Sequence, residues 1–248
     1  MPAPTAPSPV DAEPAGPRQR RKEARPQELL DAALTLFVEK GFAATRTDEV
    51  AQRAGVSKGT LYLYYPSKEE LFKAVVRTNL SNLIAEGQEM VRQFEGSSAE
   101  LLRCLIQTWW QRFGSTPAAG IHKVVLAEVR NFPELAQFYT DEVILPADQL
   151  FGSCVERGVA RGEFRPMPVH EVALALIAPL IFMAVHNHSF GCCPVHGAQM
   201  DPEAQLETHL DLVLRGLEVR AAPAKTARPR APAGTPARHG KPGAKPRA

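Results

Sequence analysis

The sequence predicts an all-α protein in which an N-terminal three-helix helix-turn-helix domain is followed by a larger helical domain, with about nine helices in all. Apolar residues recur at intervals of three and four along most of the chain, which is typical of amphipathic helices. The body of the sequence shows no strand-like alternation of apolar and polar residues. Between residues 45 and 68, two short helical patterns meet at Gly55, as a helix-turn-helix requires.

The first helix ends at Gly41, and its apolar stripe consists of Leu29, Leu30, Ala33, Leu34, Phe37 and Val38. In the pair that follows, Thr47 can cap the first short helix, Gly55 supplies the turn and Ser57 caps the second helix. Leu61 fills the gap between the two helices. These features predict a compact helix-turn-helix whose second helix is free to enter a groove of DNA.

The second helix of this pair predicts a DNA-reading surface. Gly59 and Thr60 are small enough for the backbone to lie deep in the major groove, and Lys58 can reach phosphate or guanine. Lys68 begins the next helix, capped by Ser67 with Glu70, where a DNA phosphate would supply an anion. The residues predicted to contact DNA are Arg46, Thr47, Ser57, Lys58, Gly59, Thr60, Tyr62, Tyr64, Tyr65 and Lys68. For each tyrosine taken alone, a place in the core is the alternative.

Residues 26–80 resemble the N-terminal domain of the TetR family of transcriptional repressors. The matching residues are Leu29-Leu30-Asp31-Ala32-Ala33, Leu36-Phe37, Lys40-Gly41-Phe42, Thr45, Thr47, Val50-Ala51, Ala54-Gly55-Val56-Ser57-Lys58-Gly59-Thr60-Leu61-Tyr62 and Tyr64-Tyr65-Pro66-Ser67-Lys68-Glu69-Glu70-Leu71. Tyr65 stands where the family usually has phenylalanine. The resemblance implies a cytoplasmic regulator that binds double-stranded operator DNA as a homodimer. The effector domains of the family vary too much for a ligand to be carried over.

Further helices are expected beyond the helix-turn-helix. A long helix from Ser67 to about Ile84 joins the two domains, and the others are expected at residues 98–113, 121–131, 133–160 with a kink at Pro146, 169–190 with a bend at Pro179, and 202–220. The predicted domains are a disordered basic arm (1–24), a helix-turn-helix DNA-binding domain (25–84), a helical effector-binding and dimerisation domain (85–220) and a disordered basic tail (221–248).

The last two helices are more apolar than a surface hairpin requires. A helix that is apolar nearly all round must be buried on most of its surface. Two such helices that meet their symmetry mates would form a four-helix interface, so a homodimer through the last two helices is expected. The alternative is that the whole stripe belongs to the intramolecular core.

Aromatic and amphipathic side chains gather after residue 80 and predict a pocket for a small hydrophobic effector. We expect ligand contacts from Trp110, Phe113, His122 and Met183, which lie in the middle of helices that should enclose space. The alternative for each of them is core packing.

Three histidines and two cysteines lie close together as His186, His188, Cys192, Cys193 and His196. Imidazole and thiolate are suitable ligands for zinc or copper, and adjacent thiols are a possible redox sensor. The spacing is not that of a usual zinc site, however, and a plain loop is the third alternative. We therefore assign no metal site and no cofactor, and keep a metal- or redox-responsive regulator as the second functional hypothesis.

The net charge of +2 conceals an asymmetry. Residues 221–248 hold seven bases and no acid, whereas residues 26–80 hold seven of each. The basic cluster at residues 18–25 is either an arm that reaches DNA or a solubilising tail. We expect neither a signal peptide nor a membrane span, and four cysteines in such a chain suggest a reducing cytoplasm. Because no motif pairs a nucleophile with a base, the sequence does not indicate an enzyme.

Overall fold

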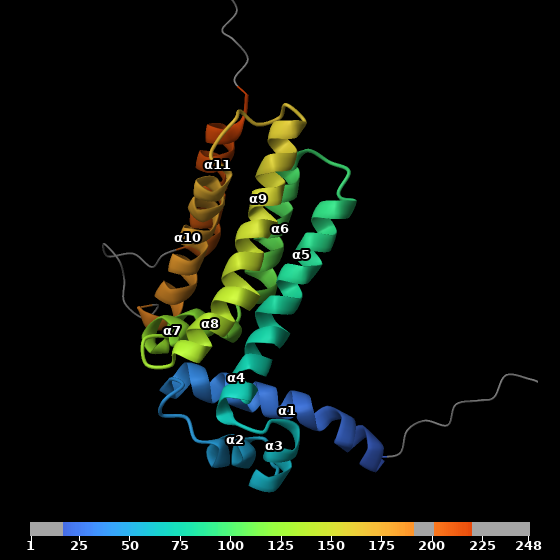
Figure 1. Ribbon diagram of the computed structural model, residues 1–248, viewed down its shortest axis with the longest axis vertical. Coiled ribbons are helices and arrows are strands. Elements are labelled where there is room, and N and C mark those ends of the chain that lie inside the picture. Colours follow the sequence, from blue (N-terminus) through green and yellow to red (C-terminus); the bar gives the residue numbers. More distant parts are fainter. Residues whose placement is uncertain (1–16, 191–200, 220–248) are drawn as a thin grey trace, which may run out of the picture.

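A computed structural model describes residues 17–190 and 201–219, and the regular elements within these ranges are all helical (Figure 1). The α-helices are α1 (Pro17–Lys40), α2 (Thr47–Arg53), α3 (Lys58–Tyr64), α4 (Lys68–Val76), α5 (Asn82–Gln93), α6 (Ser98–Trp109), α7 (Gly120–Glu128), α8 (Pro133–Tyr139), α9 (Leu145–Ala160), α10 (Val169–Ser189) and α11 (Pro202–Leu217). Two pairs of these helices, α4 with α5 and α8 with α9, are continuous through a π-helical turn, so the described ranges hold nine continuous helices. This all-helical architecture confirms the predicted fold class.

The π-helical turns are η1 (Arg77–Ser81) between α4 and α5, η2 (Trp110–Gly114) after α6, and η4 (Thr140–Ile144) between α8 and α9, and a 3₁₀ turn, η3 (Pro117–Ala119), precedes α7. The kink expected at Pro146 coincides with η4, which ends just before Pro146. Proline has no N–H to donate to the preceding turn, and a local change to i→i+5 hydrogen bonding is a common way to accommodate such a defect.

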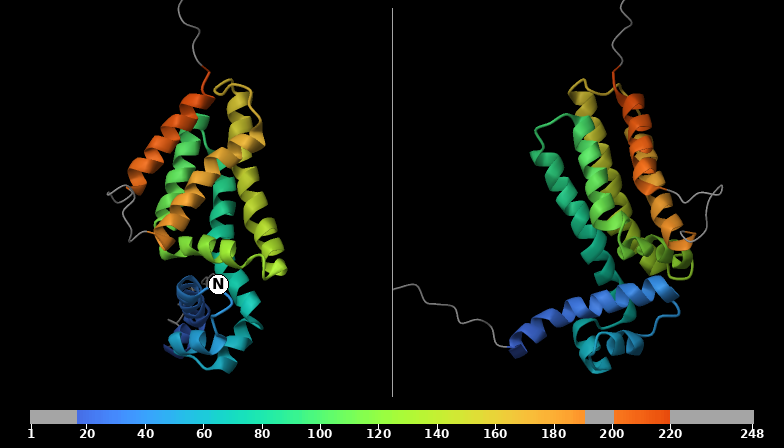
Figure 2. Two further views of the ribbon diagram at one scale, coloured as in Figure 1. Left: turned by 90° about the vertical axis from the view of Figure 1, so that its left-hand side faces the viewer. Right: turned by 180° about the vertical axis from the view of Figure 1, so that it is seen from behind.

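Helices α1–α4 form a small head below a tall bundle of α5, α6, α9, α10 and α11, and α7 and α8 lie between the two parts (Figure 1). Figure 2 shows that α1 runs across the base of the bundle and extends beyond it on one side. Because α1 begins at Pro17, residues 17–24 are helical rather than disordered as expected. The remainder of the predicted arm and tail lies outside the described residues.

The helix caps agree with the sequence in most places. The Ser57 hydroxyl accepts a hydrogen bond from the Thr60 N–H, and the Ser67 hydroxyl accepts one from the Glu70 N–H. Thr47 does not cap α2, because Arg46 occupies the N-cap position and its side chain makes no cap hydrogen bond. The Ser67–Glu70 pair completes only half of the expected capping box, since Glu70 forms an ion pair with Lys73 at 2.8 Å.

Helix α10 is long and apolar enough, by length and composition, to cross a membrane, whereas no such segment was expected from the sequence. The helix packs against α7, α9 and α11 in the bundle. A core helix of a folded domain passes the same test of length and composition, so the feature is weak support for a membrane span.

An aromatic cluster joins the head to the bundle. The Phe42 ring is fully buried and packs against Phe37 and Phe72 of the head, with ring centroids 5.7 and 5.4 Å away, and against Phe132 of the upper part at 4.8 Å. Edge-to-face aromatic pairs add to the free energy that burial alone provides. One side chain in the loop after α1 therefore links the two parts of the molecule.

Replacing Phe42 with alanine should lower the free energy of unfolding by about 3–5 kcal/mol, because the substitution leaves a cavity that these rings cannot fill. Urea unfolding followed by circular dichroism measures the change. Leu63→Ala is the matched control, because the Leu63 side chain is 79% exposed and its loss should cost less than about 0.5 kcal/mol. A Phe42→Ala protein as stable as this control would contradict the role of the cluster.

Candidate DNA-binding surface and ligand pocket

The head exposes one face of α3. Leu61 is the only buried residue of this helix and packs into the head, while Lys58, Gly59, Tyr62 and Leu63 are exposed. Gly55, between α2 and α3, has a φ of 67°, a left-handed conformation that glycine adopts without strain. The turn therefore places α3 across α2 with its polar and small residues directed away from the core.

Hydrogen bonds hold the side chains of this face in position. The Thr47 and Tyr62 hydroxyls lie 2.9 Å apart and link α2 to α3. The Ser57 and Thr60 hydroxyls lie 2.8 Å apart at the start of α3, and the Lys58 ammonium lies 6.0 Å from the centre of the Tyr62 ring. These contacts fix the orientation of the residues that sequence analysis assigned to DNA.

Arg46 precedes α2 and forms an ion pair with Asp48 at 3.1 Å. The hydrogen bond from Arg46 holds the pKa of the Asp48 carboxyl below its ordinary value. The Arg46 side chain is largely exposed, so phosphate can compete with Asp48 for the guanidinium.

Lys68 and Tyr65 make contacts inside the head. The Lys68 ammonium donates to the carbonyl oxygens of Phe42 at 2.9 Å and Ala43 at 3.1 Å, and it lies 4.5 Å from the centre of the Phe42 ring. The Tyr65 hydroxyl donates to the carbonyl oxygen of Pro26 at 3.5 Å, and Tyr64 is half-buried. Their contact with DNA stays a prediction.

Sequence reasoning missed Leu63, whose side chain is 79% exposed on the outer face of α3. The signal was available, because Leu63 lies on the side of the helix opposite to the buried Leu61 side chain, three residues after Thr60. An exposed leucine on a helix suited to the major groove can contact a thymine methyl group.

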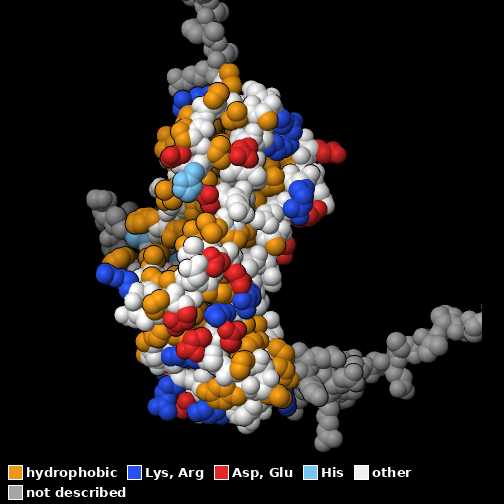
Figure 3. Space-filling view, viewed as in Figure 1, with side chains coloured by type: hydrophobic (Ala, Val, Ile, Leu, Met, Phe, Trp, Pro, Cys, Tyr) orange, Lys and Arg blue, Asp and Glu red, His pale blue; other side chains and the backbone are white. Residues whose placement is uncertain are grey.

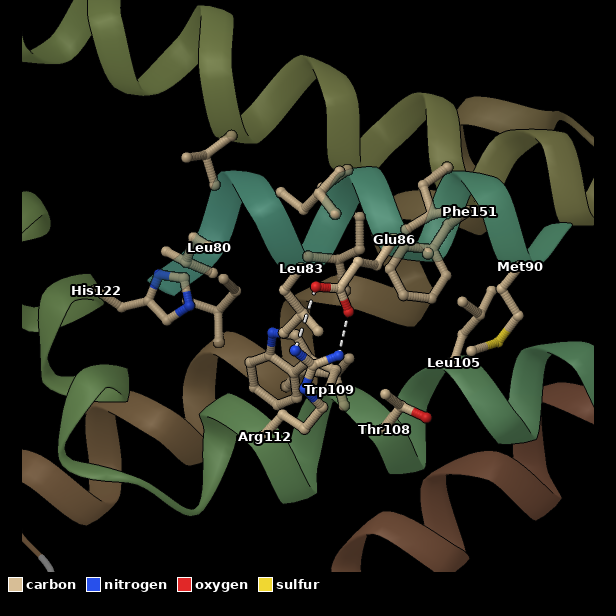
Figure 4. A pocket seen from close by; sticks show the side chains of 18 residues that line it. Leu80, Leu83, Glu86, Met90, Leu105, Thr108, Trp109, Arg112, His122 and Phe151 are labelled. Atoms are coloured by element: carbon tan, nitrogen blue, oxygen red, sulfur yellow. Dashed lines mark hydrogen bonds and ion pairs between the residues drawn. The ribbon is translucent and has the colours of Figure 1, made fainter. Parts of the chain in front are cut away.

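The upper part encloses a cavity of about 90 Å³ between α5, α6, α7, α9 and α10 (Figure 4). Most of its lining is apolar. The side chains around it come from Leu80, Leu83, Ile84, Glu86, Gly87, Met90, Leu105, Thr108, Trp109, Arg112, His122, Val143, Ala147, Leu150, Phe151, Ile177, Leu180 and Ile181. Glu86 and Arg112 are its only charged residues and form an ion pair with each other, and each side chain is more than half exposed. The cavity therefore has an apolar interior and one paired charge at its edge.

Of the four residues predicted to contact a ligand, His122 borders this cavity. Trp110, Phe113 and Met183 are buried, but they do not line it. The adjacent residue Trp109 lines the cavity, whereas Trp110 had been expected to do so. Sequence reasoning missed Trp109 and Arg112, although Leu105, Trp109 and Arg112 share one face of a helix at intervals of four and three.

His122 is held in a fixed orientation by Tyr139. The Tyr139 hydroxyl lies 2.7 Å from Nδ1 of His122, and both side chains are buried. Burial lowers the pKa of His122 to about 4, with a smaller contribution from His188, and burial also raises the pKa of Tyr139. At neutral pH the pair is therefore uncharged, with neutral imidazole beside neutral phenol.

The predicted metal or redox cluster is only partly visible. Cys192, Cys193 and His196 lie outside the described residues. His186 is buried between the Phe182 and Phe190 rings, and His188 lies near the carbonyl oxygen of Thr116 at 3.3 Å. Within residues 17–190 and 201–219, no three His, Cys, Asp or Glu side chains are grouped so as to hold a metal ion.

The model of bacterial regulatory proteins of the tetR family matches residues 29–75, and the tetracyclin repressor-like C-terminal domain matches residues 95–189. The HTH-type transcriptional repressor KstR2 of Rhodococcus jostii (strain RHA1) is 28% identical over 197 residues, which are 79% of this chain and 92% of the relative.

Solved structures share the fold. FadR from Bacillus subtilis in complex with stearoyl-CoA superimposes with a TM-score of 0.61 at 19% identity, and the match covers 77% of this chain and 98% of that one. The ketosteroid transcriptional regulator KstR2 of Mycobacterium tuberculosis gives a TM-score of 0.60 at 20% identity, with 79% and 96% covered. At these identities the match shows a common architecture.

The buried neutral His122 predicts a pH-dependent stability. Between its ordinary pKa of 6.5 and the lowered value of about 4, the unfolded chain binds a proton that the folded chain does not. The free energy of unfolding should therefore be fully retained above pH 6.5 and should fall by about 2 kcal/mol on going from pH 7.5 to pH 5 through this residue. Urea unfolding at the two pH values measures the fall.

His122→Phe should remove most of this dependence. The exposed His170 provides the control, because His170→Phe should leave the dependence unchanged. His188 and His209 also have a pKa lowered by burial, so a smaller slope should remain in the His122 variant. An identical slope in the wild type and the His122 variant would show that this imidazole does not control the stability.

Proposed function

Because the chain belongs to the TetR family of bacterial regulatory proteins, we propose that it is a homodimeric transcriptional repressor that a small, mainly apolar ligand releases from its operator. The chain is a DNA-binding transcriptional regulator. The observation that carries the proposal is the pairing of an exposed α3 face in the head with an apolar cavity in the bundle, where α7 borders the cavity and packs against α1 of the head. A regulator of this kind acts where the DNA is, in the cytoplasm.

The exposed face of α3 supports the DNA-binding half of the proposal. Gly59 has open space around its α-carbon, with only the Ser57 hydroxyl oxygen within 4 Å of the position that a β-carbon would take. The backbone of α3 can therefore approach the floor of the major groove closely at this point. Thr60 and Tyr62 flank the same face, from which their hydroxyl groups can reach base edges in the groove.

Exposed apolar residues on the last two helices support the homodimer. The Leu174 and Phe182 side chains of α10 are 57% and 60% exposed, and Leu212 of α11 is 68% exposed. Figure 3 shows apolar side chains gathered over the side of the bundle on which α10 and α11 lie. Monomeric proteins rarely expose a large apolar patch to water. In a homodimer with a two-fold axis, this face of each subunit would be buried against the same face of the other.

Helix α7 supports communication between the pocket and the head. It carries His122 at the cavity, while Gly120, two residues earlier, packs against the Val38 side chain of α1. At its other end, the Glu128 carboxylate accepts a hydrogen bond from the Ala43 N–H, in the loop that follows α1, at 3.1 Å. A ligand that displaces α7 would therefore change the position of α1, so it would favour the conformation that DNA does not bind.

The nature of the cavity supports an apolar effector. Its lining is mostly aliphatic and aromatic, and the two charged residues are paired with each other. FadR from Bacillus subtilis, a neighbour in fold, is known in complex with stearoyl-CoA, which has a long apolar chain. The cavity of about 90 Å³ is small, so we expect side chains around it to move when an effector enters.

DNA binding can be tested with fragments from the region upstream of the gene itself. The wild type should retard such a fragment, and Thr60→Val or Tyr62→Ala should reduce the preference for it over random DNA while the fold is kept, because these side chains face the groove. Electrophoretic mobility shift assays measure both. A variant with full discrimination would show that these residues do not read the operator.

A salt titration separates phosphate contacts from base contacts. Lys58→Gln should weaken binding to all sequences and reduce the slope of log K against log salt by about one, since one counterion is no longer released. Arg92→Gln is the control. This substitution also removes one positive charge, but Arg92 lies on α5, far from the head. If the slope changes equally in both variants, Lys58 has no special contact with phosphate.

The homodimer is tested by Phe182→Glu. A carboxylate in the centre of an apolar interface is costly, so this variant should be monomeric in sedimentation velocity at concentrations where the wild type is dimeric, and it should lose operator binding. Ile144→Glu is the matched control, because Ile144 is 52% exposed and lies at the end of η4, which packs chiefly against η1, α8 and α9 rather than against the last two helices. A strictly monomeric wild type that ignores every genomic duplex would overturn the proposed function.

A further inference from the structure

We propose that His122 donates a hydrogen bond from Nε2 to a neutral oxygen acceptor, such as a carbonyl, at the buried end of an otherwise apolar effector. The inference rests on the proposed function, since it names the chemistry of the ligand that the same cavity would take. It follows from the state of the His122–Tyr139 pair, from the lack of a partner for Nε2, and from the distribution of charge around the cavity.

The hydrogen-bond partners of Tyr139 fix the tautomer of His122. A phenol carries one proton that it must donate when it is buried. Within the described residues, Nδ1 of His122 is the only acceptor within reach of the Tyr139 hydroxyl, at 2.7 Å. The hydroxyl therefore donates to Nδ1, so Nδ1 carries no proton. The imidazole is neutral, so its remaining proton is on Nε2.

Nε2 is a buried donor that no described residue satisfies. The His122 side chain is 4% exposed, and its Nε2 atom is shielded from solvent and makes no hydrogen bond. Figure 4 shows the ring at one end of the cavity with a nitrogen turned toward the other lining side chains. A buried N–H without an acceptor is costly, and a ligand oxygen placed there would relieve that cost.

The charges around the cavity indicate a neutral acceptor. A carboxylate or phosphate at His122 would lie among apolar lining side chains such as Leu80 and Trp109, with no unpaired cation among the described lining residues to compensate it. Arg112 is the only basic residue of the lining, and its guanidinium is engaged by Glu86. Burying an unpaired anion is far more costly than burying a carbonyl group that accepts one hydrogen bond.

Two probes of similar shape test the inference. Benzophenone offers a carbonyl oxygen between two rings, and diphenylmethane has a methylene group in its place. Isothermal titration calorimetry with the full-length protein at pH 7.5 should show that benzophenone binds about tenfold more tightly than diphenylmethane, which is the effect of one buried hydrogen bond. In His122→Phe the two probes should bind equally, and in the control His170→Phe the tenfold preference should remain.

Nitrogen-15 NMR of histidine-labelled wild-type protein tests the same inference without any substitution. The ring of His122 should show the tautomer with the proton on Nε2, and benzophenone should shift that N–H resonance whereas diphenylmethane should not. In Tyr139→Phe the tautomer should no longer be fixed, and the preference for the ketone should fall. A proton found on Nδ1 in the wild type would overturn the inference even if every variant failed to fold.

The outcomes separate this inference from the proposed function. Equal binding of both probes by the wild type would overturn the role of His122 and leave an apolar effector pocket in place. If neither probe binds while the protein still shifts operator DNA, both the His122 inference and the ligand-controlled part of the proposed function are overturned. Loss of DNA binding alone, with the tenfold preference intact, would overturn the proposed function but not the hydrogen bond.

Discussion

The close packing of α7 against α1 is the contact on which the rest of the structure depends. Gly120 lies so near Val38 that a β-carbon on this glycine would come within 2.5 Å of Cγ1 of Val38. The absence of a side chain lets α7 lie directly on the head, and His122, two residues later in the same helix, borders the cavity. The cavity and α1, the longest helix of the head, therefore contact positions only two residues apart on α7. Packed interiors transmit such displacements because they have few voids to absorb them.

Buried and half-buried polar groups have hydrogen-bond partners in the head, whereas one buried polar atom at the cavity has none within the described part of the chain. In the head, the ammonium of Lys68 is satisfied by two carbonyl oxygens, and the Thr47 hydroxyl is satisfied by Tyr62. At the cavity, Nε2 of His122 has no partner among the described residues. A fully satisfied network favours one rigid arrangement, whereas an unsatisfied donor beside empty space favours whatever can supply an acceptor. The difference fits the proposed roles of the two parts, a rigid DNA-reading head and a ligand-responsive bundle.

The sequence alone predicted the fold well and the pocket poorly, for different physical reasons. Helices follow from local periodicity and caps, so segments such as 169–190 and 202–220 agree with α10 and α11 to within a few residues. Which side chain faces a cavity depends on helix rotation, and η2 changes the helical phase directly after Trp109. Trp109 lies before this change, on the same face of α6 as Leu105, and lines the cavity, whereas Trp110 begins η2 and is buried without lining it. The hydrogen bond between His122 and Tyr139 joins α7 to α8, and no local sequence pattern predicts it.

The apolar composition of α10 reflects its contacts with the cavity and with three neighbouring helices. One side of this helix contributes Ile177, Leu180 and Ile181 to the cavity, and the helix packs against α7, α9 and α11. The same helix also exposes the Leu174 and Phe182 side chains to solvent. A helix that served only the core of one chain would have a polar outer face, because exposed apolar residues add nothing to the stability of a monomer. Such exposed apolar residues fit the proposed homodimer, in which the helix that borders the cavity would also border the partner subunit. In such an arrangement, a ligand that moves α10 would alter the spacing of two heads at once.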